Sequence, residues 1–136
     1  MEFELLTLTG TKFLGPFRQV NLATTEGEMG ILNHHEPLTA VVAPGPVTIM
    51  GPKGQSEVYA IFGGLLEITE KRARLLADEA EHIEDLVTSE IEAALAQARA
   101  MKANAKDKYE LARAQELIDR QVVRLGVAKM RRHRKP

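Results

Sequence analysis

Glycine and proline are distributed very unevenly along this 136-residue chain, and that distribution limits the folds it can adopt. Nine of the ten glycines lie in residues 1–64, and five of the six prolines lie in residues 1–52. Beyond Ser89 the chain is rich in Ala, Glu, Lys, Arg and Leu, with Gly126 as its one glycine. Because glycine and proline interrupt helices and mark turns, the first part predicts short strands and the second part predicts long helices.

Charge changes at the same place. Residues 1–80 carry 6 basic and 10 acidic groups, whereas residues 81–136 carry 12 basic and 9 acidic groups. We therefore expect two domains, a β domain over residues 1–82 and a helical domain over residues 83–136.

Two kinds of feature are absent from the sequence. The chain has no cysteine, which excludes disulfides and thiolate metal sites, and it has no run of about 18 apolar residues that would span a membrane.

The first domain shows the pattern of an antiparallel sheet. Short runs of β-branched and aromatic residues are each followed by glycine, proline or polar residues. Residues 51–54, Gly-Pro-Lys-Gly, predict a hairpin turn, and Glu70-Lys71 predicts a second one. Eight to ten strands of this size make a small sandwich or barrel. The overall prediction is an α+β fold: an N-terminal antiparallel β-sandwich of about ten strands, then a C-terminal antiparallel two-helix hairpin.

The second domain has helical periodicity. Ser89 followed by Glu92 predicts a capping box, and the apolar stripe that follows is Ile91, Ala94, Leu95, Ala98 and Met101. Asp107 followed by Glu110 predicts the start of another helix, with a stripe at Leu111, Ala114, Ile118, Val122 and Leu125. Two helices with a short polar connection pack antiparallel. The stripes are those of a helix–helix seam, and a nonpolar ligand pocket between the helices is the alternative.

No arrangement of residues in the sequence is typical of catalysis. His34-His35-Glu36 resembles a metal cluster, but adjacent side chains of an extended segment point apart and no second ligand pair follows, so a surface turn is the better interpretation. The glycine pairs lack the lysine of a phosphate-binding loop, and no serine lies in a nucleophile elbow. We therefore expect neither an enzyme nor a metal site, and a small hydrolase is excluded for want of a nucleophile and a base.

The strongest electrostatic feature is the basic C-terminus. Six cations and no acid lie in the last thirteen residues, at Arg124, Lys129, Arg131, Arg132, Arg134 and Lys135. A nucleic-acid site would need aromatic stacking platforms, and Tyr109 is the only aromatic residue after Phe62. A solvated helix end, whose cations favour the helix dipole, and a contact with an acidic protein partner both remain open.

Four segments, taken together, resemble a known family. Residues 27–38 read Gly-Glu-Met-Gly-Ile-Leu-Asn-His-His-Glu-Pro-Leu, and residues 43–45 read Ala-Pro-Gly. Residues 62–68 read Phe-Gly-Gly-Leu-Leu-Glu-Ile, and residues 75–80 read Leu-Leu-Ala-Asp-Glu-Ala. In this order they resemble the signature of the epsilon subunit of F-type ATP synthases, and the resemblance spans the chain.

The resemblance implies a non-catalytic rotor subunit. The sandwich would bind the gamma subunit and the membrane c-ring, and the hairpin would either fold down or extend toward the alpha/beta catalytic head and inhibit ATP hydrolysis. Glu28 and His35 match the loop that faces the c-ring. Asn33-His34 replaces the family's Pro-Gly, and Glu36 replaces its Ala. The protein would lie on the cytoplasmic face of a bacterial inner membrane or the stromal side of a thylakoid, held there by the complex.

Some members of this family bind ATP through an Ile/Leu-Asp-x-x-Arg-Ala motif. The matching stretch begins at Ile83 and Glu84, and Val87 stands where the motif has Arg. Losing that arginine removes a bidentate contact to phosphate, although Arg120 and Arg124 match positions that nucleotide-binding members use. We therefore expect no cofactor, or at most weak ATP binding.

The competing hypothesis is a β-sandwich adaptor, unrelated to rotary catalysis. Its basic hairpin would bind RNA or an acidic protein partner, and its binding to nucleic acid would be sensitive to salt. The family signature over residues 27–38 favours the rotor subunit, for which we expect no nucleic-acid partner.

Overall fold

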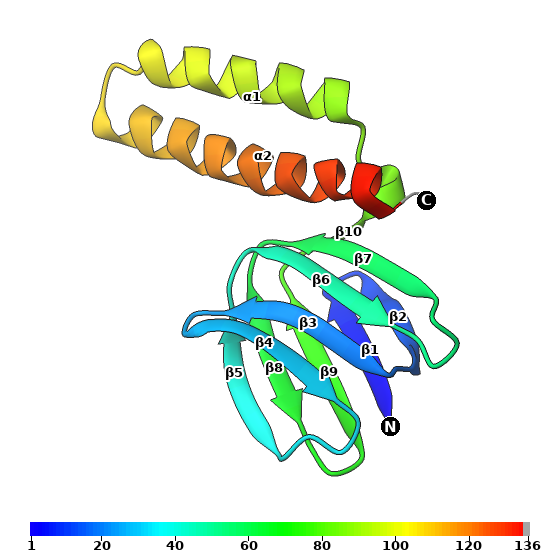
Figure 1. The fold of residues 1–136 in the computed structure, drawn as a ribbon. Helices are drawn as coiled ribbons and strands as arrows, with labels where there is room; N and C mark the ends of the chain where they lie inside the picture. The colour runs from blue at the N-terminus through cyan, green and yellow to red at the C-terminus, as the bar shows by residue number, and fades with distance from the viewer. Residues whose placement is uncertain (135–136) are drawn as a thin grey trace. The chain divides into compact units, whose positions relative to one another are not determined.

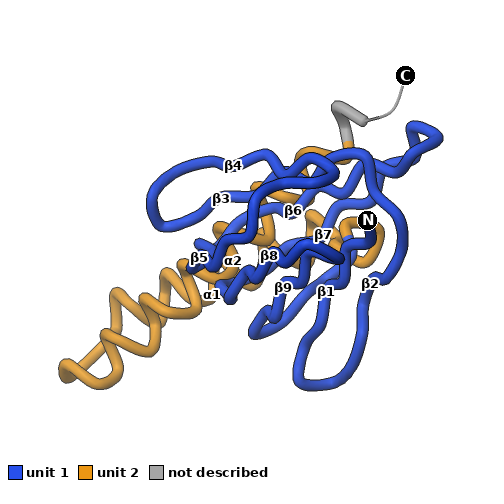
Figure 2. The backbone as a smooth tube through the Cα atoms, turned by 90° about the horizontal axis from the view of Figure 1, so that it is seen from below, with its two compact units in different colours: residues 1–82 blue, residues 83–136 orange. Residues whose placement is uncertain are grey.

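The computed structural model describes residues 1–134 of the chain, and their side chains as far as Arg131. It divides into two compact units, Met1–His82 and Ile83–Pro136 (Figure 2). The first unit is built of strands and the second of helices (Figure 1). The predicted α+β fold is therefore confirmed.

Ten strands make up the first unit. They are β1 (Glu2–Thr7), β2 (Gly10–Pro16), β3 (Gln19–Thr24), β4 (Gly27–Leu32), β5 (Leu38–Val42), β6 (Gly45–Met50), β7 (Ser56–Ile61), β8 (Gly64–Ile68), β9 (Arg72–Ala77) and β10 (Ala80–His82). Both predicted hairpin turns are present, between β6 and β7 and between β8 and β9.

The strands form two layers of one continuous sheet. One layer runs β10-β7-β6-β3-β4 and the other runs β5-β8-β9-β1-β2. A single pair, Thr24 with Val42, joins β3 to β5 and thereby connects the layers. All pairings are antiparallel except that between β1 and β9. Parallel pairing is possible there because the chain between these two strands passes through the rest of the sandwich.

The core follows from alternation along most of the strands, although β7 buries residues 58–61 in succession. In β9, for example, Ala73, Leu75 and Ala77 are buried, while Arg72 and Leu76 are exposed. Successive side chains of a strand point to opposite faces of a sheet, so one set from each layer fills the space between the layers. The largest fully buried members come from seven strands and one connection: Phe3, Leu5, Phe17, Val20, Ile31, Ile49, Ile61, Leu66 and Leu75.

The Gly-Gly pair at the entry to β8 has a steric reason. Gly63 has a φ of +131°, which L side chains rarely adopt. A Cβ on Gly64 would lie 2.5 Å from the carbonyl oxygen of Leu76, on the neighbouring strand β9. Only glycine therefore allows the two backbones to approach so closely at this point.

The second unit contains a short 3-10 turn, η1 (Ile83–Asp85), and two α-helices, α1 (Thr88–Ala103) and α2 (Lys108–Arg134). The predicted capping box at Ser89 is wrong: the N-cap residue is Val87, and it makes no side-chain capping bond. Helix α1 begins earlier because η1 leads directly into it. The prediction for α2 is confirmed, since the amide of Glu110 donates to Oδ1 of Asp107 at 2.8 Å.

The two helices bury a mixture of large and small residues. Ile91, Leu95 and Ala98 are buried on α1, and Val127 is buried on α2 together with Ala114, Gln121 and Ala128, which are spaced seven residues apart. The predicted stripe on α2 is wrong at Leu111 and Val122, which are 43% and 50% exposed. A seven-residue spacing keeps side chains on one face of a helix, and that face passes through the alanines and Gln121.

Candidate partner-binding surfaces

Four adjoining strands carry an exposed apolar row on the outer face of their layer. The register places Val41 of β5 beside Leu65 of β8, Leu65 beside Leu76 of β9, and Leu76 beside Leu6 of β1. Val41, Leu65 and Leu76 are 55%, 46% and 48% exposed, and Leu6 is half-buried. We call these four residues the apolar row.

A charged row runs beside the apolar row on β8, β9 and β1, two residues away from it on each strand. Glu67 of β8 pairs with Arg74 of β9, which pairs with Glu4 of β1. Nε of Arg74 lies 3.0 Å from Oε1 of Glu4, and Nη1 of Arg72 lies 3.9 Å from the same oxygen. Ion pairs at the surface contribute little to stability, but they fix where these charges stand around the apolar row.

This combination is typical of a surface that binds another protein. A contiguous exposed apolar patch bordered by polar residues marks interaction sites more often than chance exposure does. Protein interfaces have the same anatomy, with an apolar centre and a polar rim. Sequence reasoning missed this surface.

A sequence pattern for the apolar row does exist. Each of the four strands carries an apolar doublet, Leu5-Leu6, Val41-Val42, Leu65-Leu66 or Leu75-Leu76. In a strand with one solvated face, one member of each doublet would be polar. The doublets therefore place apolar side chains on both faces of this layer, one set in the core and the other in the apolar row.

The structure places Glu28 and His35 at opposite ends of β4. Glu28 lies inside the strand, paired with Ala23 of β3, and is exposed. His35 is half-buried in the turn that follows the strand, where its Nδ1 lies 2.8 Å from the carbonyl oxygen of Glu36. With about 3.4 Å per residue along a strand, the structure does not bring the two side chains together in one loop.

The turn after β4 is held by a side-chain hydrogen bond and contains a residue with positive φ. His34 stands where the family pattern has glycine, and it adopts a positive φ of 64°. Nδ2 of Asn33 donates to the carbonyl oxygen of Phe17 at 2.8 Å, which ties the turn to the chain just before β3. This side-chain hydrogen bond restrains the turn at a position where the family pattern has proline.

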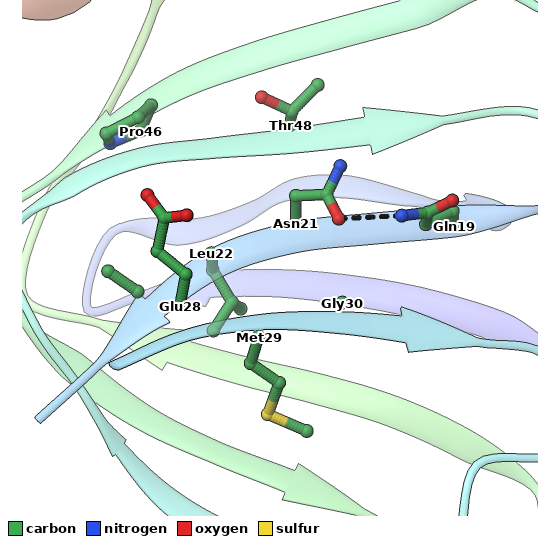
Figure 3. Close-up of a pocket in the computed structure, with 9 residues that line it drawn as sticks. Gln19, Asn21, Leu22, Glu28, Met29, Gly30, Pro46 and Thr48 are labelled. Atoms are coloured by element: carbon green, nitrogen blue, oxygen red, sulfur yellow. Dashed lines mark hydrogen bonds between the residues drawn. The ribbon is translucent and has the colours of Figure 1, made fainter. Parts of the chain in front are cut away.

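An open groove with a mixed lining lies on the other layer, over β3, β4 and β6 (Figure 3). Gln19 donates from Nε2 to Oδ1 of Asn21 at 2.8 Å, and Thr48 pairs with Asn21 on the next strand. Gly30 forms part of the floor, since a Cβ there would lie 3.2 Å from Oδ1 of Asn21. The two layers therefore differ: this outer face carries a groove with polar and apolar lining, and the other carries the apolar row.

The four residues considered for nucleotide binding are not equivalent in the structure. Ile83 is fully buried and Glu84 is exposed. Glu84 forms an ion pair with Arg131, whose Nη1 lies 3.4 Å from Oε2 of Glu84. Arg124 donates to Oε1 of Gln121 at 2.8 Å and lies two helical turns before Arg131, about 10 Å along the axis; Arg120 lies one turn further away. Val87, at the N-cap of α1, has no group to donate to a phosphate.

The six cations of the C-terminus also differ from one another in exposure and hydrogen bonding. Lys129 is exposed, while Arg124 and Arg131 are half-buried and hydrogen-bonded. Arg132 and Arg134 belong to α2, but their side chains lie outside the described residues, as does all of Lys135.

The described part of the chain, residues 1–134, holds neither a cluster of metal ligands nor a helix that could span a membrane. Among those residues no three His, Cys, Asp or Glu side chains gather in a way that could hold a metal ion. Residues 1–134 also include no helix long and apolar enough to cross a membrane.

Comparison with known proteins now decides the family. The model of the "ATP synthase, Delta/Epsilon chain, beta-sandwich domain" family matches residues 1–83. The ATP synthase epsilon chain of Herpetosiphon aurantiacus is 35% identical over 134 residues, which cover 98% of either chain. The chain belongs to the family of ATP synthase epsilon chains.

Other relatives agree. The ATP synthase epsilon chain of Dichelobacter nodosus is 33% identical over 126 residues, covering 90% of this chain and 88% of that one. A chain of the Euglena gracilis mitochondrial ATP synthase has the same fold, with a TM-score of 0.79 and 22% identity over 94% of this chain and 79% of its own. An epsilon chain is a non-catalytic accessory subunit of ATP synthase, which confirms the prediction that this protein is not itself an enzyme.

Proposed function

We propose that this epsilon chain is a rotor subunit of a proton-translocating F-type ATP synthase, in which its sandwich joins the gamma subunit to the c-ring. The observation that carries the proposal is the apolar row, bordered by the charges of Glu67, Arg74 and Glu4. A subunit that transmits torque must stay attached to the gamma subunit. An apolar face bordered by charges suits such a lasting contact.

The fold neighbours support this assignment by analogy. A chain of the Tetrahymena thermophila mitochondrial ATP synthase, in a structure of its central stalk and c-ring, shares the fold with a TM-score of 0.60 at 14% identity, over 94% of this chain and 96% of its own. Through the assembly the protein would lie at the membrane surface, on the cytoplasmic or stromal side, and contact lipid only through the complex. Family membership favours this function over the RNA-binding adaptor.

Capture of partner subunits tests the proposal. Tagged full-length chain, mixed with detergent-solubilised synthase subunits from the same source, is expected to retain gamma and the c-ring. Binding should persist at high salt, because an apolar contact is not screened. Retention of RNA in place of gamma would show that the adaptor hypothesis is correct.

Glu28 tests the contact with the c-ring. Its carboxylate is exposed on β4, so Glu28→Lys should leave the fold intact. If this strand faces the c-ring, the reversed charge should weaken the coupling of proton flow to ATP synthesis by several-fold, measured as ATP synthesis per proton in membrane vesicles. Glu26→Lys, the same change in the preceding turn, is the control. Equal coupling in both variants would contradict a c-ring role for Glu28.

We also propose that the hairpin inhibits ATP hydrolysis when it extends toward the alpha/beta head, and that any ATP binding is weak. The seam of α1 and α2 is rich in alanine, at Ala98, Ala114 and Ala128. A buried alanine contributes less than a leucine by about 0.8 kcal/mol for each missing CH₂. Two arrangements of the helices can therefore lie within a few kcal/mol, as a switch requires.

A further inference from the structure

The guanidinium of Arg131 connects the end of the helical unit to its beginning. Nη2 donates to the carbonyl oxygen of Leu86 at 2.6 Å. Nη1 lies 3.4 Å from the carbonyl oxygen of Glu84 and 3.4 Å from Oε2 of the same residue. One side chain near the C-terminus thus holds two backbone carbonyls and a carboxylate, from residues 45 and 47 positions earlier.

The segment that Arg131 holds is the short connection from which the hairpin starts. Its single-turn helix η1 is closed by the amide of Leu86, which donates to the carbonyl oxygen of Ile83 at 3.2 Å. Ile83 and Leu86 are fully buried, and Val87 begins α1 without a side-chain cap. Arginine suits this position because its planar fork presents several donors at once, whereas lysine presents one compact charge.

This contact adds a polar bond to a seam in which several buried residues are alanines. Bonds to a charged group are stronger than neutral ones, roughly twofold, and this one is partly shielded, since the Arg131 side chain is 28% exposed. Along the helices, by contrast, the buried residues of α2 include two alanines. The bonds of Arg131 therefore add a charge-assisted contact at the end of the hairpin where α2 meets η1.

We propose that Arg131 is the latch of the hairpin: its bonds to Glu84 and Leu86 hold α2 against η1, and their release is the first step of opening. This assigns Arg131 a role opposite to that of a free inhibitory cation, because in the folded hairpin it is already engaged. The latch stands on the contacts described; only its effect on ATP hydrolysis rests on the proposed function.

Amide hydrogen exchange on the full-length chain tests the latch. Arg131→Gln is expected to raise the exchange rates of α2 amides between Gln121 and Met130 by about tenfold, since exchange follows local opening. Lys129→Gln removes the same charge from an exposed position two residues away and should change these rates less than twofold. Glu84→Gln keeps both carbonyl bonds and should give an increase of about two- to threefold.

Equal exchange in Arg131→Gln and Lys129→Gln would overturn the latch. If Arg131→Gln also loses protection in the strands of residues 1–82, the variant has lost its fold, and Arg131→Lys is measured instead. A latch predicts faster exchange in α2 for that variant too, because lysine lacks the fork, whereas rates like those of the unmodified chain would overturn it.

Measurements on the assembled synthase distinguish the latch from the proposed inhibition of ATP hydrolysis. If the extended hairpin inhibits hydrolysis, Arg131→Gln should lower the ATP hydrolysis rate severalfold relative to Lys129→Gln, because the hairpin opens more readily. Faster exchange together with unchanged hydrolysis would support the latch and overturn the inhibitory function. A higher hydrolysis rate in Arg131→Gln would show that Arg131 serves the extended state, and would overturn the latch.

Discussion

Deleting residues 88–136, which removes both helices, is expected to raise the ATP hydrolysis rate of the assembled synthase severalfold while leaving the complex assembled. The deletion keeps Ile83 and Leu86, which are fully buried, and begins where α1 begins. The core of the sandwich consists of residues between Phe3 and Ala77, so the truncated chain retains all of it. The measurement compares ATPase activity of complexes that contain the full-length or the truncated chain.

A shorter deletion is the control for this result. Removing residues 132–136 takes away Arg132, Arg134 and Lys135 but keeps Arg131 and its bonds. The increase should be smaller and should shrink further at high salt, because exposed charges are screened. If the complex lacking residues 88–136 hydrolyses ATP no faster at any proton-motive force, the hairpin is a structural clamp and the inhibitory function is wrong.

The sequence predicted the architecture well because glycine and proline act locally. The turns at 51–54 and 70–71 and the N-cap at Asp107 all depend on residues within four positions of one another. The capping box at Ser89 failed because η1 precedes α1 and moves its start back to Thr88. A short 3-10 turn has no distinctive composition, so the pattern of α1 alone could not reveal it.

The binding surfaces were less predictable because they depend on pairing between distant strands. Val41, Leu65, Leu76 and Leu6 form one row only through the register of four strands. The bond of Arg131 to Leu86 joins residues 45 positions apart, and nothing in the basic run distinguishes Arg131 from its neighbours. Local patterns predict elements, whereas these contacts require the topology.

Leu65→Asp is expected to weaken binding of the chain to the gamma subunit by at least about a hundredfold, or about 2.7 kcal/mol. Leu65 lies in the middle of the apolar row and is 46% exposed, so the exposed part is what a partner would cover. The substitution removes that apolar contact and places an unpaired carboxylate where water is excluded, at a further cost of several kcal/mol. Titration of gamma with each variant measures the affinity directly.

Leu32→Asp is the matched control for this measurement. Leu32 is 57% exposed at the end of β4, in the other layer of the sandwich, and the chemical change is the same. Both variants should keep the thermal stability of the unmodified chain within a few degrees, because neither side chain belongs to the core. Binding that is lost in Leu65→Asp and kept in Leu32→Asp places gamma on the apolar row. If Leu65→Asp binds gamma as tightly as the unmodified chain, the row faces another partner, and the doublets in β1, β5, β8 and β9 need a different explanation.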